Sequence, residues 1–195
     1  EYYETTAHAG ARPSHAEWQG RVFKIHGSSP DYPNFVDSTG YGSGAGLCGW
    51  NCRHSFYPYW PGISSPAYSK ERLAEYDRAK YSYNGDMLTD YECSQIQRAY
   101  EREIREIKRI LSSYDAAMQE SRSEAQIQCI QEDFTSESVK LKKKERELKN
   151  FCNDTNRNYD SARTQVVAYK DSNGKIVNFG RSTAQKAVWA NKKSN

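Results

Sequence analysis

Apolar side chains recur every three or four residues along two long stretches of the chain, residues 89–119 and 123–150. The apolar positions are Ile96, Tyr100, Ile104, Ile107, Leu111, Tyr114 and Met118 in the first stretch, and Ile127, Ile130, Phe134, Leu141, Leu148 and Phe151 in or just after the second. This spacing places them on one face of each helix. Because the connection at 120–123 is short, we predict an antiparallel helical hairpin with Glu, Lys and Arg on its solvated faces.

Segments rich in β-branched and aromatic residues predict short β-strands towards both ends of the chain. Near the N-terminus, residues 2–6 and 21–25 have this character. Towards the C-terminus, residues 166–169 and 175–179 flank an Asn-Gly dipeptide at 173–174, which is typical of a tight hairpin turn.

Capping residues predict three shorter helices. Ser14 and Glu17 fit a capping box, in which each side chain bonds to the backbone of the other residue at the start of a helix. Ser69 suits the N-cap of a helix over 69–81, and a last helix is expected over 183–189.

Residues 26–66 show neither pattern and are predicted to be a long loop. They hold five of the six Pro and most of the Gly, with aromatic residues between them. A loop of this length is usually functional or anchored. We therefore predict an α+β fold in three parts: a motif domain over 1–85, the helical hairpin over 86–152, and a β-hairpin with a terminal helix over 153–195. We expect the third part to pack back on the first.

Composition narrows the function classes. The 195 residues carry 28 basic and 25 acidic side chains, a net charge of +3, so charge alone does not indicate a general nucleic-acid-binding protein. We recognise no signal peptide and no apolar run near the roughly 18 residues of a membrane-spanning helix, so no membrane partner is expected. The first residue is Glu1 rather than Met, and we expect an N-terminal part of a longer chain to precede it.

Two stretches, residues 5–20 and 40–54, concentrate the residues that can bind metal. Their thiols and imidazoles belong to His8, His15, Cys48, Cys52 and His54. Both groups are usual ligands of zinc, so a structural zinc ion is one interpretation. The spacing Cys-x3-Cys-x-His is not a stereotyped zinc-finger pattern, however. The alternative is a pair of reduced thiols in a crowded Gly-rich loop, and the sequence alone does not require a cofactor.

Two further hypotheses use the same stretches. A phosphodiester could be cleaved by imidazoles acting as base and acid beside guanidinium groups, and the candidate catalytic residues are His8, Arg12, His15, Arg53 and His54. Aromatic rings could stack on bases while arginines contact phosphates, and the candidate binding residues are Arg12, Trp18, Arg21, Trp50, Asn51 and Arg53. The alternatives are hydrogen bonds that lock the loops, and a small aromatic core beneath them.

The same stretches carry a resemblance to a known family. Residues 8–23 are HAGARPSHAEWQGRVF, and residues 39–59 are TGYGSGAGLCGWNCRHSFYPY. Both resemble the signature of the phage minor capsid protein 2 family, and residues 100–105 resemble the region that follows it. More distantly, the segments 12–15 and 51–53 are similar to the Mu-type minor head proteins.

This resemblance implies a structural protein of a phage or prophage head, close to the portal, that assists head assembly or DNA delivery. The implied partners are other head or portal proteins and phage DNA, and the implied locations are the virion and the host cytoplasm. The helical hairpin would then supply a protein-contact surface. An alternative from another class is a phage-carried effector enzyme, a nuclease or nucleotide-acting toxin, that uses the His and Arg residues.

Overall fold

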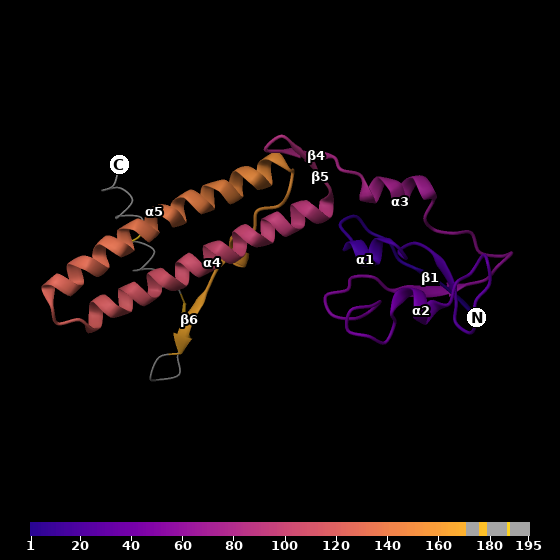
Figure 1. The fold of residues 1–195 in the computed structure, drawn as a ribbon, viewed down its shortest axis with the longest axis horizontal. Coiled ribbons are helices and arrows are strands. Elements are labelled where there is room, and N and C mark those ends of the chain that lie inside the picture. Colours follow the sequence, from indigo (N-terminus) through magenta and orange to yellow (C-terminus); the bar gives the residue numbers. More distant parts are fainter. Residues whose placement is uncertain (171–175, 179–186, 188–195) are drawn as a thin grey trace. The chain divides into compact units, whose positions relative to one another are not determined.

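A three-stranded antiparallel sheet organises the N-terminal part of the chain (Figure 1). β1 (Tyr2–Thr5) is the central strand, between β2 (Val22–Lys24) and β3 (Phe56–Tyr59). The strands predicted over 2–6 and 21–25 are confirmed. The prediction of an uninterrupted loop over 26–66 is wrong, because β3 pairs with the free edge of β1 inside that stretch.

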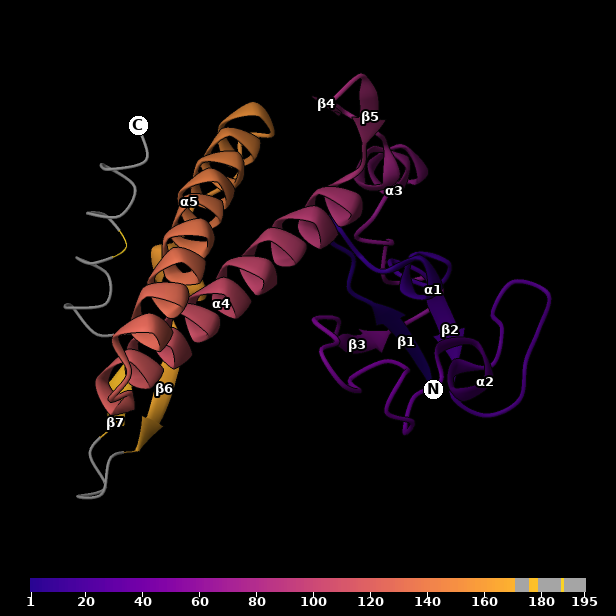
Figure 2. The same cartoon turned by 60° about the vertical axis from the view of Figure 1, so that its left-hand side comes forward.

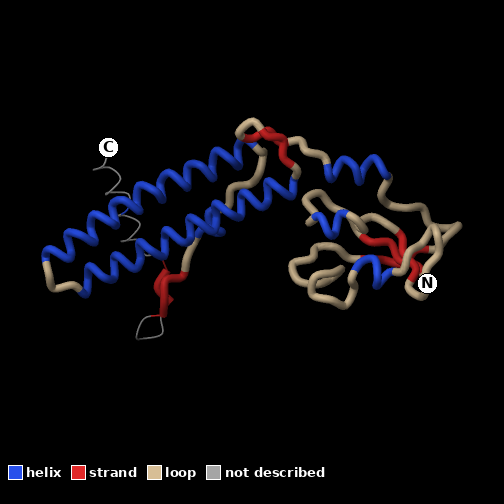
Figure 3. The backbone as a smooth tube through the Cα atoms, viewed as in Figure 1, coloured by secondary structure: helices blue, strands red, loops and turns tan. Residues whose placement is uncertain are grey.

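The structure is a computed structural model that describes residues 1–170, 176–178 and 187. The chain divides into two units, residues 1–94 and 95–195, which are considered separately below. Figure 3 shows how short strands and helices alternate with loops before the long helices begin.

Two short helices flank the motif stretches. α1 (Pro13–Ala16) has Arg12 at its N-cap and no side-chain capping bond, so the predicted capping box is not formed. The reason is that the helix begins at Pro13, two residues earlier than a Ser14 cap requires, since the fixed φ of proline suits the first helical position. α2 (Phe35–Thr39) was not predicted; the Asn34 side chain caps its first turn and Gly40 ends it in the left-handed conformation.

The core of the first unit lies between the sheet and the Gly-rich loop. Its fully packed members are Trp18, Phe23, Phe35 and Leu47, with Tyr3, Ile25, Cys52 and Phe56 partly buried against them. Leu47 comes from the loop and is only 1% exposed. The loop is therefore anchored in the core by an apolar side chain.

A helix and a hairpin follow before the long helices. α3 (Lys70–Asp77) has the predicted N-cap at Ser69 but ends before residue 81. The next residues form a hairpin of β4 (Tyr81–Tyr83) and β5 (Asp86–Leu88), two strands that were not predicted. The residues between the strands, Asn84 and Gly85, both have positive φ, as a tight hairpin turn requires.

The two long helices form the predicted antiparallel hairpin, and both views show them side by side (Figures 1 and 2). They are α4 (Asp90–Glu120) and α5 (Glu124–Asp154), and Ser123 caps α5. Most of the predicted apolar positions are buried: Ile104, Ile107, Leu111, Phe134, Leu141, Leu148 and Phe151. Positions near the turn and near the start of α4, including Ile96, Met118 and Ile127, are half-buried. The seam is thus tightest in the middle and towards the end of α5.

Charged pairs cross the same seam. Lys108 Nζ lies 3.1 Å from Glu145 Oε1, and Lys144 Nζ lies 3.2 Å from Glu103 Oε2. A 3₁₀ helix, η1 (Ser161–Thr164), follows α5 and places Arg163 against the buried Glu101. These contacts fix the register of the hairpin.

The last described strands, β6 (Val167–Lys170) and β7 (Ile176–Asn178), pair antiparallel, as predicted. The α+β fold with a helical hairpin and small antiparallel sheets is therefore confirmed. The helix predicted over 183–189 lies outside the described residues apart from position 187, and the packing of 153–195 on 1–85 stays a prediction. No helix among the described residues is both long enough and apolar enough to cross a membrane.

Candidate metal centre

Strand pairing brings the two motif stretches together. The N–H of Thr6 donates to the carbonyl of Ser55 over 2.8 Å, and the N–H of Ser55 donates to the Thr6 hydroxyl over 2.9 Å. His8 therefore follows β1 at the point where His54 precedes β3. His15 approaches the same point from α1.

One thiol and two imidazoles converge there. Cys52 Sγ lies 3.7 Å from Nδ1 of His15 and 3.7 Å from Nδ1 of His54. The three atoms all lie within 4.8 Å of one another. We call His15, Cys52 and His54 the metal triad; its two imidazoles are buried, at 2% and 5% exposure, and Cys52 is half-buried.

The far side of each imidazole is held by an oxygen. His15 Nε2 lies 3.0 Å from the carbonyl oxygen of Ala45, and His54 Nε2 lies 3.2 Å from Oε1 of Gln19. Gln19 Oε1 also accepts the backbone N–H of His8 over 3.1 Å. Because oxygen acceptors require N–H donors, both rings carry their hydrogen on Nε2, and both Nδ1 lone pairs face the Cys52 sulfur.

Electrostatics keeps these rings neutral. Burial, and after it the neighbouring His8, His15, Arg53 and Arg12, lower the pKa of His54 to about 4. Burial also lowers the pKa of His15, although the Ala45 carbonyl opposes this effect. Neutral imidazole is the form that binds metal ions.

Cys48 lies at the edge of the triad. Its Sγ is 3.7 Å from the carbonyl oxygen of His54, and Cys52 Sγ is 3.9 Å from the same oxygen. Cys48 is exposed, and partial burial followed by the nearby Cys52 raises the pKa of its thiol. The two predicted cysteine ligands therefore point at one carbonyl from a single turn.

Close backbone crossings shape that turn. A Cβ on Gly46 would lie 2.0 Å from the carbonyl oxygen of Gly40, so no other residue fits there. Cys48 and Asn51 both adopt positive φ, near 59° and 56°. The Gly-rich sequence thus allows the close backbone packing of this loop.

His8 is near the triad without belonging to it. Its ring stacks on that of His54, with centroids 4.3 Å apart, and its Nδ1 lies 2.9 Å from the carbonyl oxygen of Ala9. Nε2 of His8 and Nε2 of Gln19 are buried without a hydrogen-bond partner in the described part of the chain. Two unpaired polar atoms thus belong to side chains in direct contact with His54.

The predicted binding residues are spread over different environments. Trp18 is 5% exposed and packs against the rings of His15 and His54. Arg12 donates to the carbonyl of Trp50 over 2.8 Å, while the Trp50 ring itself is 79% exposed. Asn51 and Arg53 are exposed, and Arg21 is exposed and donates to the Glu17 carbonyl.

Sequence analysis missed Gln19 and the carbonyl of Ala45, which orient the two imidazoles. Gln19 follows His15 by four residues, and its N–H bonds to the His15 carbonyl over 3.0 Å. Residues four apart lie on one side of a helical turn, and this spacing was the available signal.

Comparison with known proteins gives the family of the chain. Residues 1–153 match the family described as Phage minor capsid protein 2, and the chain belongs to this family. The resemblance noted from the motifs is confirmed.

Two curated relatives, each named "Structural protein", come from Lactococcus phages. The one from phage LL-H is 37% identical over 108 residues, which is 53% of this chain and 26% of the relative. The one from phage mv4 is 38% identical over 80 residues, which is 41% of this chain and 55% of the relative. The matches thus span about a quarter and about half of the lengths of these relatives. No solved structure matches the chain.

Proposed function

We propose that this chain is part of the phage particle, as a minor head protein near the portal that contacts other head proteins during assembly or DNA delivery. The observation that carries the proposal is the family match over residues 1–153, which covers both motif stretches and nearly all of the helical hairpin. The names of the two relatives agree with a structural role.

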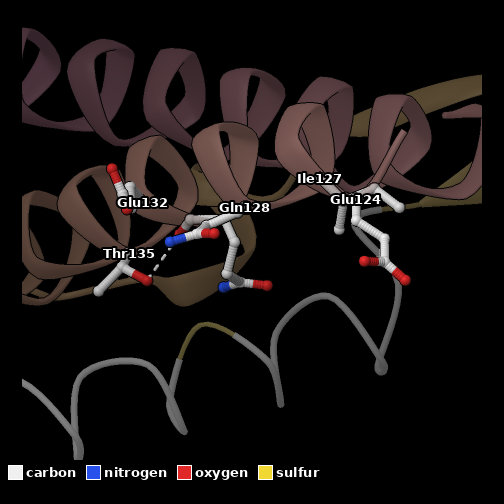
Figure 4. A pocket seen from close by; sticks show the side chains of 6 residues that line it. Glu124, Ile127, Gln128, Glu132 and Thr135 are labelled. Atoms are coloured by element: carbon white, nitrogen blue, oxygen red, sulfur yellow. Dashed lines mark hydrogen bonds between the residues drawn. The ribbon is translucent and has the colours of Figure 1, made fainter. Parts of the chain in front are cut away.

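The hairpin supplies the proposed contact surface. Most of its apolar side chains are used in its own seam, and its outward faces carry mainly polar and charged groups. One shallow depression on α5 is lined by Glu124, Ile127, Gln128, Gln131, Glu132 and Thr135 (Figure 4). Residues at this spacing share one side of a helix, which is how a helix presents a surface to another protein.

The buried imidazoles favour this structural role over the effector enzyme. A catalytic base must reach its substrate, whereas His15 and His54 are almost inaccessible to solvent. Moreover, a pKa of about 4 makes His54 a weak base at neutral pH. Hydrolysis of RNA, DNA or nucleotides by the wild-type protein, lost in a folded His8→Ala or His15→Ala variant, would instead support the enzyme.

Arginines on the second unit provide a proposed contact with phage DNA. Arg98, Glu101, Arg102, Arg105 and Arg163 line one depression. Arg163 pairs with Glu101 over 2.8 Å, whereas Arg98 and Arg102 are exposed. Replacing both exposed residues by Gln is expected to weaken DNA binding. The slope of the logarithm of the binding constant against the logarithm of the salt concentration should fall in magnitude by about two, because two phosphate contacts are lost. Arg146→Gln, which changes an exposed arginine on α5, is the control. If it weakened DNA binding as much, the arginines of this depression would not be a specific binding site.

Deletion of the gene from the phage tests the role in the particle. Electron microscopy of the resulting lysate separates the two proposed stages. Absent or aberrant heads would indicate assembly, and normal DNA-filled heads that fail to infect would indicate DNA delivery. Normal heads with undiminished infectivity would contradict both.

A further inference from the structure

We propose that the metal triad, together with Cys48, binds a structural zinc ion that fastens the two motif stretches to each other. The ligand atoms would be Nδ1 of His15, Sγ of Cys52, Nδ1 of His54 and Sγ of Cys48. The ligand class follows from the residues, since thiolate and imidazole together are typical of tetrahedral zinc sites.

The distances within the triad fit such an ion. In a tetrahedral site with usual bond lengths, a sulfur and a nitrogen ligand lie about 3.6 Å apart. The two distances from Cys52 Sγ to the imidazole Nδ1 atoms are both 3.7 Å. A thiol hydrogen could serve one Nδ1 lone pair at a time, whereas a cation would satisfy both lone pairs and the sulfur together.

The outer hydrogen bonds fit as well. Metal-binding imidazoles usually donate their other N–H to an oxygen, which fixes the tautomer and the direction of the lone pair. Ala45 and Gln19 provide these oxygens for His15 and His54. The orientation of both rings is therefore set by groups outside the triad.

Cys48 is assigned as the fourth ligand in preference to His8. Both cysteine thiols contact the carbonyl of His54, and an exposed side chain such as Cys48 can rotate towards the triad. His8 also offers a nitrogen without a partner in the part of the chain that the structure describes, Nε2, but its ring is held in a stack on the face of His54 and by the bond from Nδ1 to the Ala9 carbonyl. Two cysteines and two histidines form a common structural zinc set.

The position of the site explains what the ion would do. Residues 8–15 contain no cysteine, so a disulfide cannot link them to residues 48–54. Among the described residues, the apolar core beneath the loop has four buried members, which is a small core. A zinc ion would add a cross-link at the point where α1, the Gly-rich loop and the start of β3 meet, independently of any role of the protein in the phage head.

Zinc content of the purified full chain is the first test. We expect about one zinc ion per chain in wild-type protein, measured by elemental mass spectrometry after gel filtration. Cys52→Ser is expected to lose the metal, whereas Cys129→Ser, an exposed cysteine on α5, is expected to retain it. Metal-free wild-type protein that takes up no added zinc would overturn the proposal, and so would full zinc content in a folded Cys52→Ser variant.

Cobalt(II) in place of zinc reports the geometry and the sulfur ligands of the site from the wild-type spectrum itself. Wild-type protein should show the visible bands of tetrahedral cobalt and the near-ultraviolet band of sulfur-to-cobalt charge transfer. Cys48→Ser should reduce the charge-transfer band by about half, one thiolate of the two. His8→Ala should leave the spectrum unchanged. Octahedral cobalt without charge transfer in the wild type would overturn the site, and an unchanged spectrum in Cys48→Ser would overturn its fourth ligand.

Discussion

Thr6 and Ser55 are joined by two hydrogen bonds, one between their backbones at 2.8 Å and one from the Ser55 N–H to the Thr6 hydroxyl at 2.9 Å. This contact continues the pairing of β1 with β3 beyond the sheet. It holds the segment with His8 beside the segment with Cys52 and His54. The site therefore depends on a strand pairing between residues far apart in sequence.

Removing the Thr6 hydroxyl should loosen this connection. Thr6→Val keeps the shape of the side chain but leaves the Ser55 N–H to water, so the free energy of unfolding of residues 1–94 should fall by about 1 kcal/mol. Urea denaturation followed by Trp fluorescence suits this measurement, because three of the four Trp lie in that unit. Thr135→Val, a change on α5, should alter this free energy of unfolding by less than about 0.5 kcal/mol. A loss as large as that of Thr6→Val would contradict a local effect.

Gln19 should matter more than its uncharged side chain suggests. Its Oε1 accepts from both the His8 N–H and His54 Nε2, and Gln19 is 2% exposed. Gln19→Met removes the acceptor from two poorly accessible donors, which should cost about 2 kcal/mol or more in the same urea experiment. The exposed Gln128→Met is the matched control. A neutral effect of Gln19→Met would show that the imidazole needs no fixed acceptor.

The Lys108–Glu145 pair should stabilise the helical hairpin more than a surface pair does. The Lys108 side chain is only 7% exposed, whereas Glu145 is 37% exposed. Glu145→Ala removes the carboxylate from a poorly solvated ammonium group and should cost about 1–2 kcal/mol, measured by circular dichroism in urea. Glu137→Ala should cost clearly less, because its partner Lys140 is 60% exposed and well solvated, although Glu137 itself is 17% exposed. Equal losses would contradict the difference in burial.

Alkaline pH should weaken the first unit through Tyr57. Burial, and then its hydrogen bond with the buried Glu4, raises the pKa of Tyr57 well above the ordinary value of 10.0. A raised folded-state pKa stabilises the fold below the unfolded pKa, and this contribution is lost as the pH rises above it.

The stability of the wild type should therefore fall as the pH rises above about 10, and Tyr57→Phe should flatten that part of the profile. At neutral pH the variant should lose about 1 kcal/mol, because Glu4 loses a hydrogen-bond donor. Tyr59→Phe on the same strand is the control. A Tyr57→Phe profile that remains as steep as that of the wild type would contradict this assignment.

The helical hairpin was predictable because many apolar residues repeat with one period along both stretches. β3 was not predictable on the same basis, because Pro58 stands in it opposite Tyr3 and proline lacks a donor for strand pairing. It is tolerated because β3 is an edge strand of the sheet. α2 is only five residues long, so its sole signals were the caps Asn34 and Gly40.

The candidate site was predictable as a list of residue types but not as a geometry. The sequence left His8 and His15 equivalent, and the structure separates them because α1 directs Nδ1 of His15 at Cys52 while His8 stacks on His54. Trp18, which we had considered for base stacking, packs beside the same imidazoles. Such distinctions depend on tertiary contacts that residue spacing does not encode.

Mass spectrometry of purified phage particles tests the central claim most directly. The particles should be gradient-purified and nuclease-washed, from the phage that encodes this chain. We predict that peptides from residues 1–195 are found in the particles, at a few copies relative to the major capsid protein. Their absence from particles, with clear presence in the same lysate, would contradict a structural role in the phage head.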